Sequence, residues 1–504
     1  MRKTAVITLL FAAFLHLAPF PVHGAARLTI LHVNDLHGRI LPSLDRTVRG
    51  DEPVGGAAYL ACMVERERTR NPGGTLLLSA GDMFQGTPVS DLFRGRPVLE
   101  VMNRLGFDAM ALGNHEFDWG RQVLAGIIKG ARFPVLSANI VDRRGRYLPG
   151  VKPYVTVERK GIKIALIGLT TPETPYATKG ENVRGLSFLD PLRVLPRLLR
   201  EVRRQGARVT LVLSHLGLDR DRELAAGVAG IDVIVGGHSH TKVADPIVVG
   251  RTRIVQAGAH GLYLGVLELS IDERTGRVVG ATGTGELRLV SAGPADEFDP
   301  EIARIAATYR EKIKARLERV VGETTEELTR HPQGESNLGD LITDAMRASA
   351  HAEIAIHNSG GIRADIPAGR ITMEQVYTAL PFDDALVTMD LSGEALLTLF
   401  ERVAGRDNWG MLQVSGMKIG YDAALANGRK VSHVLVNGAA LDPAKAYRVV
   451  TNDFLAAGGD GLAEFKKGSH ITYGEDLREV VVDYLLCHSP LAPATDERIV
   501  VLGR

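Results

Sequence analysis

Short apolar runs rich in Val, Ile and Leu recur along the first half of the chain and alternate with helical patterns. The length of these runs and their content of β-branched residues predict buried strands rather than helices. Because strands and helices alternate, we expect an α/β domain whose sheets are covered by helices. The strand-like runs are residues 28–33, 75–79, 109–112, 164–169, 209–214 and 231–235, and the helical patterns between them include 57–68 and 191–205.

The pattern changes near residue 290. Two apolar runs within residues 263–289 flank a polar segment and predict a hairpin that closes the first domain. Residues 291–294 are turn-like, and residues 300–320 carry a charged amphipathic pattern that predicts a solvated linker helix. A chain of 504 residues is too long for one hydrophobic core, so we expect two domains. We place the first domain at 26–292, the linker at 293–321 and the second domain at 322–504.

The N-terminal segment has the features of an export signal. Arg2 and Lys3 precede an apolar run at residues 5–18, and Pro and small residues follow it. This pattern predicts a signal peptide at residues 1–25, with a periplasmic or secreted mature protein. The alternative is an uncleaved membrane anchor, although the run is short for a span of about 20 residues. No later stretch is long and apolar enough to cross a membrane, so we expect no stable anchor after cleavage.

Charge and cysteine content narrow the class of protein. Lys and Arg number 60 and Asp and Glu number 59, which gives a formal net charge of +1. This balance disfavours a nucleic-acid polymer as the partner, whereas a small anion held by a few local charges remains compatible. The chain has two cysteines, Cys62 and Cys487, each in a helical pattern. One disulfide is possible in an oxidising compartment, but we expect two inert buried thiols.

Polar side chains follow five of the predicted strands, at the point where each strand ends. In open α/β sheets this carboxyl edge is where ligands bind. The runs before these side chains are apolar, so the polar groups are expected to converge in a partly buried place, where they need mutual pairing or a cation. The polar groups at these strand ends are Asn34, Asp35 and His37, then Asp82, then Asn114, His115 and Glu116, then His215, and finally His238 and His240.

These side chains suit divalent metal ions. Imidazole, carboxylate and amide oxygen together favour ions such as zinc, manganese, cobalt or iron. The set contains no cysteine, which argues against a structural zinc site. Seven candidate ligands exceed what one ion takes from protein, so we expect two ions that share one carboxylate and act on a phosphoryl group.

The ordered set resembles that of the calcineurin-like metallophosphatases. More narrowly, Asn114-His115-Glu116-Phe117-Asp118 is similar to the motif of the 5′-nucleotidase family. The resemblance implies an N-terminal β-sandwich flanked by helices, a linker helix and a second, α+β nucleotide-binding domain. It implies that His115 stands beside the scissile phosphate and is oriented by Asp118. It also implies one metal held by Asp35, His37, Asp82 and His240, and a second held by Asp82, Asn114, His215 and His238.

The second region carries further residues that resemble this family. After a helical pattern at 338–350 and a strand-like run at 352–356, the glycine-rich segment 358–363 permits a tight turn. The resemblance implies that Phe382 and Phe454 stack on a nucleobase. The remaining implied substrate contacts are Asn358 to the base, Asp460 to ribose hydroxyls and Arg363 to phosphate. The family usually places a further phosphate-binding Arg where this chain has Pro332, beside Arg330.

We therefore expect a phosphohydrolase that removes phosphate from nucleotides by in-line attack of a metal-bound hydroxide. The leading activity is that of a 5′-nucleotidase, with UDP-sugar or nucleoside di- and triphosphate hydrolysis also open. An alternative is a 2′,3′-cyclic-nucleotide phosphodiesterase with 3′-nucleotidase activity. A related thiosulfohydrolase would not need the two Phe residues, and an inactive binding protein would be expected to lack one or more ligands.

Overall fold

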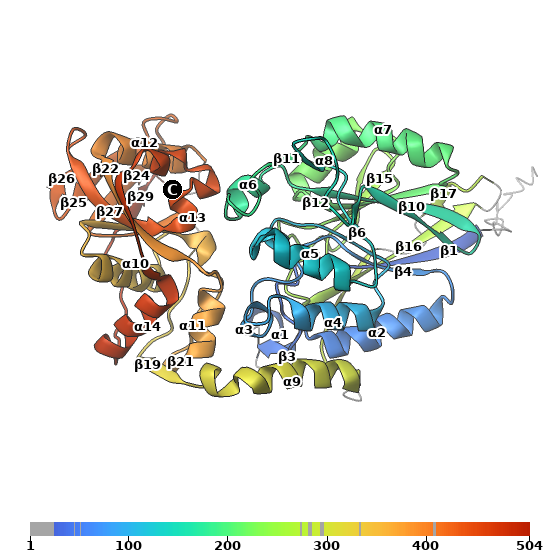
Figure 1. The fold of residues 1–504 in the computed structure, drawn as a ribbon, viewed down its shortest axis with the longest axis horizontal. Helices are drawn as coiled ribbons and strands as arrows, with labels where there is room; N and C mark the ends of the chain where they lie inside the picture. Colours follow the sequence, from blue (N-terminus) through green and yellow to red (C-terminus); the bar gives the residue numbers. More distant parts are fainter. Residues whose placement is uncertain are drawn as a thin grey trace, which may run out of the picture.

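The structure is a computed structural model that describes residues 25–44, 46–50, 52–272, 275–280, 285–292, 297–331, 334–406 and 410–503. Residues 1–24 of the predicted signal peptide lie outside the described residues, and so does Pro332. Figure 1 shows two lobes side by side, one built from the blue to green part of the chain and the other from the orange to red part.

The first sheet of the N-terminal lobe has the strand order β17-β16-β1-β4-β5-β6-β8, and β18 also pairs with β16. Strands β1, β4, β5, β6 and β8 run parallel, whereas β16 is antiparallel to β1 and to the predicted hairpin partner β17. The strands are β1 (Ala25–Val33), β4 (Thr75–Ser79), β5 (Ala109–Ala111), β6 (Val135–Leu136), β8 (Val151–Lys152), β16 (Tyr263–Asp272), β17 (Val278–Gly280) and β18 (Glu286–Leu289).

The second sheet of this lobe has the order β14-β15-β13-β12-β10-β9, and β10, β12, β13 and β15 run parallel. The strands are β9 (Tyr154–Arg159), β10 (Ile162–Thr170), β12 (Val209–His215), β13 (Val233–Gly236), β14 (Ile247–Val249) and β15 (Thr252–Val255). Two small pairs complete the lobe, β2 (Ser43–Leu44) with β3 (Pro53–Val54) and β7 (Ile140–Asp142) with β11 (Leu186–Phe188).

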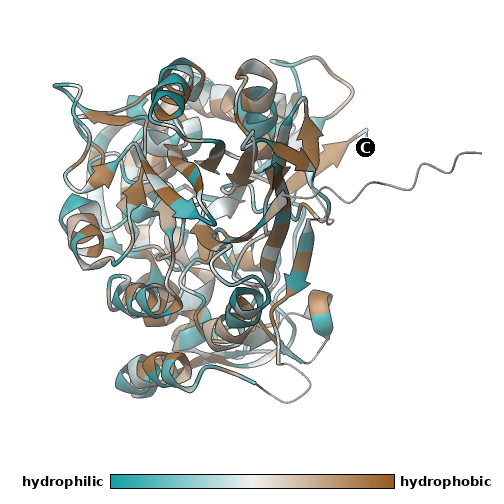
Figure 2. Ribbon diagram, turned by 90° about the vertical axis from the view of Figure 1, so that its right-hand side faces the viewer, coloured by the Kyte–Doolittle hydropathy of each residue, from teal (hydrophilic) through white to brown (hydrophobic). Residues whose placement is uncertain are grey.

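The two sheets share one apolar layer. Ile30 and Leu78 of the first sheet lie in the same buried cluster as Ile164, Leu211 and Val233 of the second. Figure 2 shows these strands as a brown, hydrophobic interior with more hydrophilic helices outside. The lobe is therefore a β-sandwich, and the strands buried on both faces are the continuous apolar runs of the sequence.

Helices cover the outer faces of the sandwich. Helices α2, α4 and α5 pack on the first sheet, and α7 and α8 pack on the second. Asp190 caps α7 by accepting a hydrogen bond from the backbone N–H of Leu192. The helices are α1 (Arg46–Arg49), α2 (Ala57–Arg70), α3 (Pro88–Asp91), α4 (Arg96–Leu105), α5 (Gly120–Gly130), α6 (Thr174–Ala177), α7 (Pro191–Arg204) and α8 (Leu218–Gly227).

The predicted linker helix is present, but it is not solvated on all sides. Helix α9 (Pro300–Leu317) runs along the bottom of the molecule in Figure 1 and contacts α2 and α4. Ile302, Ala306 and Tyr309 are buried there because their spacing places them on one face of the helix. The prediction of a solvated helix was wrong for this face.

The C-terminal lobe contains a five-stranded sheet, β23-β20-β27-β22-β28, and a four-stranded sheet, β26-β25-β24-β29. Helices α10, α11 and α14 lie in one buried cluster, and α12 lies in another. The strands are β19 (Val320–Thr324), β20 (Ile354–Asn358), β21 (Gly369–Thr372), β22 (Ala385–Ser392), β23 (Leu412–Ser415), β24 (Met417–Asp422), β25 (Val431–Val436), β26 (Ala439–Ala440), β27 (Ala446–Asn452), β28 (Ser469–Asp476) and β29 (Ile499–Leu502). The helices are α10 (Asn337–Ala350), α11 (Met373–Ala379), α12 (Gly393–Gly405), α13 (Asp453–Ala456) and α14 (Leu477–His488).

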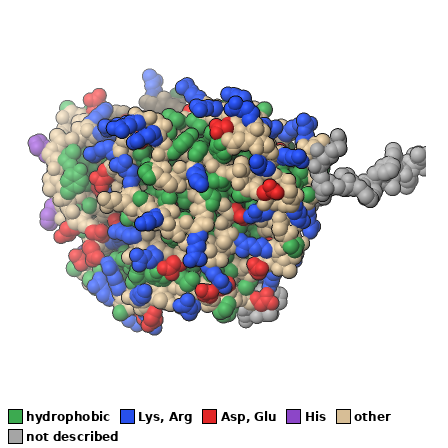
Figure 3. Space-filling view, turned by 45° about the vertical axis from the view of Figure 1, so that its right-hand side comes forward, with side chains coloured by type: hydrophobic (Ala, Val, Ile, Leu, Met, Phe, Trp, Pro, Cys, Tyr) green, Lys and Arg blue, Asp and Glu red, His purple; other side chains and the backbone are tan. Residues whose placement is uncertain are grey.

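Cys62 and Cys487 lie in α2 and α14 and are unpaired. The expectation that both thiols are buried was wrong, because Cys62 is half-buried and Cys487 is exposed. On the face shown in Figure 3, Lys and Arg side chains are spread among acidic and uncharged groups. Among the described residues, none of the helices combines the length and apolar character that a membrane span requires.

Candidate active site

The predicted polar residues lie at the carboxyl ends of β1, β4, β5, β12 and β13 or in the segments that follow, and His215 is itself the last residue of β12. Strands β1, β4 and β5 are parallel neighbours in the first sheet, and β12 and β13 are parallel neighbours in the second. Because both sets of strands end on the same side of the sandwich, their loops converge. Two groups of potential metal ligands form there, Asp35 with His37 and His240, and Asp82 with His215 and His238.

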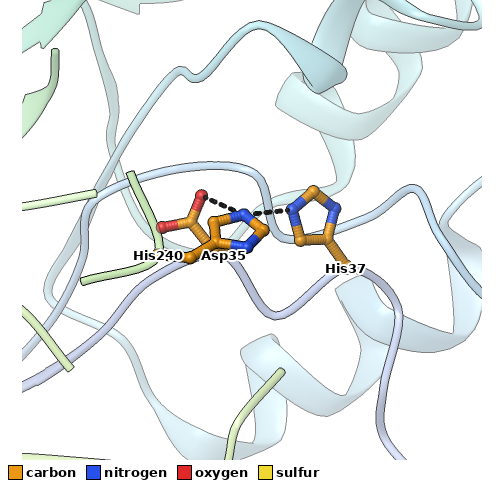
Figure 4. Close-up of side chains that lie close together, drawn as sticks. All are labelled: Asp35, His37 and His240. Atoms are coloured by element: carbon orange, nitrogen blue, oxygen red, sulfur yellow. Dashed lines mark hydrogen bonds and ion pairs between the residues drawn. The ribbon is translucent and has the colours of Figure 1, made fainter. Parts of the chain in front are cut away.

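The first group is drawn in Figure 4. The Nε2 atoms of His37 and His240 are 3.1 Å apart, and the His240 Nε2 is 3.4 Å from Asp35 Oδ1. The Nδ1 of His37 lies 3.0 Å from the carbonyl oxygen of Gln85, which can only accept, so Nδ1 carries the proton. The Nε2 of His37 therefore presents a lone pair to the other members of the group, as a metal ligand must.

The second group has the same arrangement. The Nδ1 of His215 donates to the carbonyl oxygen of Ala80 at 2.7 Å, which leaves a lone pair on Nε2. That Nε2 faces two acceptors, Asp82 Oδ2 at 3.0 Å and Asn114 Oδ1 at 3.2 Å. Three electron-rich atoms that face one another in a buried place require a cation between them.

The proton affinities of these groups show the same requirement. Burial lowers the pKa of His215, but the charge of Asp82 and the hydrogen bond to it raise the pKa to about 10. The raised pKa shows that positive charge is strongly favoured between Asp82 and His215, and a bound metal ion can supply that charge in place of a proton. Burial lowers the pKa of His238 to about 4, so this imidazole is neutral and able to ligate at neutral pH.

The backbone at these positions is unusual. Asp35, His37, Asp82, His238 and His240 all have positive φ angles, between 49° and 73°. This left-handed conformation costs a residue with a side chain about 1–2 kcal/mol. Strain of this kind is common where a loop must aim a side chain at a site. The sequence indicated these residue types but gave no signal of their backbone conformation.

Two buried residues of the predicted motifs hold the ligand loops in place. The carboxylate of Glu116 accepts backbone N–H groups from Asp82 at 3.0 Å, Met83 at 2.8 Å and Gly113 at 2.6 Å. The amide of Asn34 donates to Asp35 Oδ2 at 2.7 Å and accepts from the backbone N–H of Ala257 at 2.8 Å. The sequence pattern included both residues but predicted no role for them. A side chain that accepts backbone N–H groups cannot be recognised until the positions of the loops are known.

His115 lies beside the second group and pairs with Asp118. Its Nδ1 is 2.7 Å from Asp118 Oδ2, and the other oxygen of Asp118 accepts the Thr178 hydroxyl at 2.7 Å. Burial alone would lower the pKa of His115, but Asp118 and Asp82 together raise it above its ordinary value. The pairing engages Nδ1 of the ring, so Nε2 is the ring nitrogen that remains for a further contact.

A cavity of about 800 Å³ opens between the two lobes beside these residues. Asp35, His37 and His215 do not line it, and they are buried beneath its floor. All five residues expected to bind substrate line it, together with four of the seven residues expected at the metals. The predicted residues that line it are Asp82, Asn114, His115, Asp118, His238, His240, Asn358, Arg363, Phe382, Phe454 and Asp460.

The wall contributed by the C-terminal lobe is held by a chain of amides. Asn452 Nδ2 donates to Asn358 Oδ1 at 3.0 Å, and Asn358 Nδ2 donates to Asp460 Oδ2 at 3.1 Å. Burial raises the pKa of Asp460 to about 6, and the hydrogen bond from Asn358 opposes this rise. Asn452 also caps α13, which carries Phe454, through a bond to the backbone N–H of Leu455 at 2.8 Å. The role of Asn452 was not predicted, although the residue stands only two positions before Phe454 in the sequence.

Comparison with known proteins identifies the family. Residues 28–242 match the model for calcineurin-like phosphoesterases, and residues 320–467 match the model for the C-terminal domain of 5′-nucleotidase. The chain is 33% identical to 5′-nucleotidase of Homo sapiens, over 99% of this chain and 94% of the human protein. It is 32% identical to snake venom 5′-nucleotidase of Naja atra, over 95% of this chain and 99% of the venom protein.

The fold agrees with these matches. A crystal structure of a 5′-nucleotidase precursor from Thermus thermophilus superposes with a TM-score of 0.87 at 35% identity, covering 95% of this chain and 100% of that one. The expected fold class, an N-terminal calcineurin-like domain followed by a C-terminal 5′-nucleotidase domain, is confirmed. The chain belongs to the 5′-nucleotidase family and is a metal-dependent phosphoric monoester hydrolase.

Proposed function

We propose that the enzyme hydrolyses nucleoside 5′-phosphates with two divalent cations in its N-terminal lobe. Asp35, His37, Asp82 and His240 would hold one cation, and Asp82, Asn114, His215 and His238 the other, with Asp82 shared. The observation that carries this proposal is the lone pair of His215 Nε2, which faces two further acceptors. Zinc, manganese, cobalt and iron all suit this donor set. Such a pair of ions supplies an activated water and offsets charge on the phosphoryl oxygens.

His115 is the proposed acid and positioning group at the phosphate. Asp118 holds its Nδ1, so the Nε2–H of the protonated ring can donate to a phosphoryl oxygen or to the departing oxygen. The raised pKa keeps a larger fraction of the ring protonated near neutral pH. The 2.9 Å hydrogen bond from the backbone N–H of His115 to Asp82 Oδ1 ties this group to the proposed shared ligand.

The C-terminal wall of the cavity is the proposed nucleoside site. Stacking of a base on Phe382 and Phe454 would contribute about 1–3 kcal/mol, with little dependence on the identity of the base. Asn358, which accepts a hydrogen bond from Asn452 and donates one to Asp460, would contact the base, and Asp460 would accept ribose hydroxyls. Arg363, which lines the same cavity, would contact phosphate. A hydrolase for sulfur compounds would have no use for this pair of rings.

We also propose that the protein is exported and that the chain divides into a first domain at 26–292, a linker at 293–321 and a second domain at 322–504. The basic and apolar N-terminal pattern supports export, and so does the similarity to an enzyme found in snake venom. Determining the N-terminal residue of the protein recovered from outside the cytoplasm tests this proposal. A mature chain that begins near residue 26 supports it, and a chain that retains residues 1–24 contradicts it.

The activity is tested by phosphate release from AMP, UMP, ATP, UDP-glucose, 3′-AMP, 2′,3′-cyclic AMP and 4-nitrophenyl phosphate. Each substrate is assayed after chelation and after addition of manganese, zinc or cobalt. We expect metal-dependent release from 5′-nucleotides that falls in Phe454→Ala much more than release from 4-nitrophenyl phosphate does. Preference for the 3′- or cyclic substrates would contradict the 5′-assignment, and activity on the aryl phosphate alone would contradict nucleotide recognition.

A further inference from the structure

One lysine of the N-terminal lobe contacts both segments that carry the proposed base-stacking rings. Lys179 follows α6, at the edge of the cavity. Its ammonium donates to Asp453 Oδ2 at 2.7 Å, and Asp453 directly precedes Phe454. It also donates to the carbonyl oxygen of Asp383 at 2.5 Å, and Asp383 directly follows Phe382. In Figure 1, α6 faces α13 across the gap between the lobes.

The two ring-bearing segments are also joined to each other at this point. The backbone N–H of Ala385 donates to Asp453 Oδ1 at 3.2 Å, so the same carboxylate holds Lys179 with one oxygen and the Phe382 segment with the other. Asp384 is buried next to them, and its Oδ1 lies 4.0 Å from the ammonium of Lys179. Two neighbouring carboxylates repel each other, and Lys179 supplies the opposing charge.

The Lys179 ammonium group is partly shielded from solvent and carries a positive charge. The Lys179 and Asp453 side chains are 25% and 22% exposed, so solvent screens their pairing only in part. Burial lowers the pKa of Lys179, but the hydrogen bond to Asp453 and the charge of Asp384 more than offset this effect and raise the pKa. Lys179 is therefore charged at neutral pH.

We propose that Lys179 is a positioning residue for nucleoside recognition, which fixes the spacing between Phe382 and Phe454 from the opposite lobe. The inference rests on the proposed nucleotide activity and names a residue that controls its selectivity for nucleotides over simple phosphomonoesters. The carboxylates and the carbonyl that Lys179 contacts all belong to the C-terminal lobe, and none of them is a proposed metal ligand. Its loss is therefore expected to affect binding of the nucleoside rather than the chemistry at phosphorus.

The test compares kcat and KM for AMP and for 4-nitrophenyl phosphate in the manganese-loaded enzyme. In Lys179→Met we expect KM for AMP to rise about tenfold with little change in kcat, because the lost interaction acts on substrate binding. Both constants for 4-nitrophenyl phosphate should stay within about twofold of the wild type, which also shows that the variant is folded. Lys179→Arg keeps the charge and the donors and should recover most of the affinity for AMP.

Two controls separate positioning from a general effect of charge. Lys163→Met removes an ammonium that donates to the carbonyl of Gln205 within the N-terminal lobe, and it should leave all constants unchanged. Arg94→Met breaks an ion pair between the lobes, Arg94 to Asp383 at 2.7 Å, that contacts one ring-bearing segment only. It should raise KM for AMP less than Lys179→Met does. An equal rise would overturn the inference, because any contact between the lobes would then suffice.

A double-mutant cycle tests whether Lys179 acts through its ion pair with Asp453. Asp453→Asn removes the charge that faces Lys179, and the combined variant should bind AMP no more weakly than Lys179→Met alone. Fully additive losses would overturn the pairing. If Phe454→Ala weakens AMP binding and Lys179→Met does not, the inference fails and the proposed function stands. If neither variant weakens it, the proposed nucleoside site fails and the inference fails with it.

Discussion

The imidazole ring of His115 stacks on the phenyl ring of Phe382, with centroids 5.6 Å apart and planes inclined by 27°. The histidine belongs to the N-terminal lobe and the phenylalanine to the C-terminal lobe, so the proposed acid and one of the proposed base-stacking rings are in direct contact. The two Phe residues are therefore not equivalent, because Phe382 touches the reacting end of the cavity as well as the nucleoside end.

Replacement of the two rings should have different consequences. We expect Phe382→Ala to lower kcat/KM for both AMP and 4-nitrophenyl phosphate, because the variant removes a packing partner of His115. Phe454→Ala should lower kcat/KM for AMP by about tenfold, in line with the value of one stacked base, and spare the aryl phosphate. Steady-state kinetics with both substrates measures this difference, and an identical substrate profile for the two variants would contradict it.

Asp118→Asn should reduce kcat without releasing metal. The variant keeps the size of the side chain but removes the charge that raises the pKa of His115, so the ring is protonated less often at neutral pH. We expect kcat to fall by about 10²-fold, the lower range for loss of general acid catalysis. Metal content measured by mass spectrometry should equal that of the wild type, and a loss of metal would assign Asp118 to the metal site instead.

Glu116→Gln should weaken metal binding although Glu116 is not a proposed ligand. Its carboxylate holds the backbone of Asp82, Met83 and Gly113, and a neutral amide cannot accept all of these bonds equally well. Loss of such supporting contacts typically costs about 10–100-fold in metal affinity. The manganese concentration for half-maximal activity of the chelated enzyme measures this effect. An unchanged value would show that the backbone of Asp82, Met83 and Gly113 keeps its conformation without the Glu116 carboxylate.

Affinity for nucleotides should fall in mild acid. The pKa of Asp460 is raised to about 6, so its carboxylate takes up a proton as the pH falls through this value and becomes a poorer acceptor for ribose hydroxyls. We expect the ratio of KM for AMP to KM for 4-nitrophenyl phosphate to rise about tenfold between pH 8 and pH 5. The phosphates of the two substrates also titrate in this range, so the wild type is compared with Asp460→Asn, in which the part of the rise that depends on Asp460 should be absent.

A buried acidic group far from the cavity should influence stability. Asp340 is buried, its Oδ1 lies 3.7 Å from Arg498 Nε, and burial, with Glu335 and Asp496 nearby, raises its pKa to about 8 against the pull of Arg498. Because the folded protein holds this proton and the unfolded chain releases it near pH 4, stability falls as the pH rises from 4 to 8. The free energy of unfolding is measured by urea titration at pH 5 and pH 8. In Asp340→Asn, its decrease between these two pH values should be smaller than in the wild type by about 2 kcal/mol.

Much of the N-terminal lobe could be predicted because its strands are buried on both faces. Residues 75–79 coincide with β4, and 209–214 differ from β12 by one residue, since continuous apolar runs mark such strands clearly. The helix predicted at 300–320 was also found, but its burial was missed because the surface that covers Ile302 comes from α2 and α4, which lie far earlier in the chain.

The proposed site was predictable by residue type rather than by geometry. A histidine directly after an apolar strand, such as His215, is a strong signal, because the strand end fixes its place. Lys179 gave no such signal. It stands in an irregular segment, and its partners Asp383 and Asp453 come from the other lobe, so its position depends on how the two lobes meet. The sequence does not encode that relationship in any local pattern.

The separation of His37 and His240 has a consequence for the biosynthesis of the enzyme. Their ring nitrogens are 3.1 Å apart although the residues lie 203 positions apart along the chain. A nascent chain therefore presents the first proposed ligands long before the last ones are synthesised, and the group closes only when both sheets have assembled. If these residues bind metal as proposed, metal uptake would require a finished N-terminal lobe, and an incompletely made or misfolded copy of the enzyme would stay inactive.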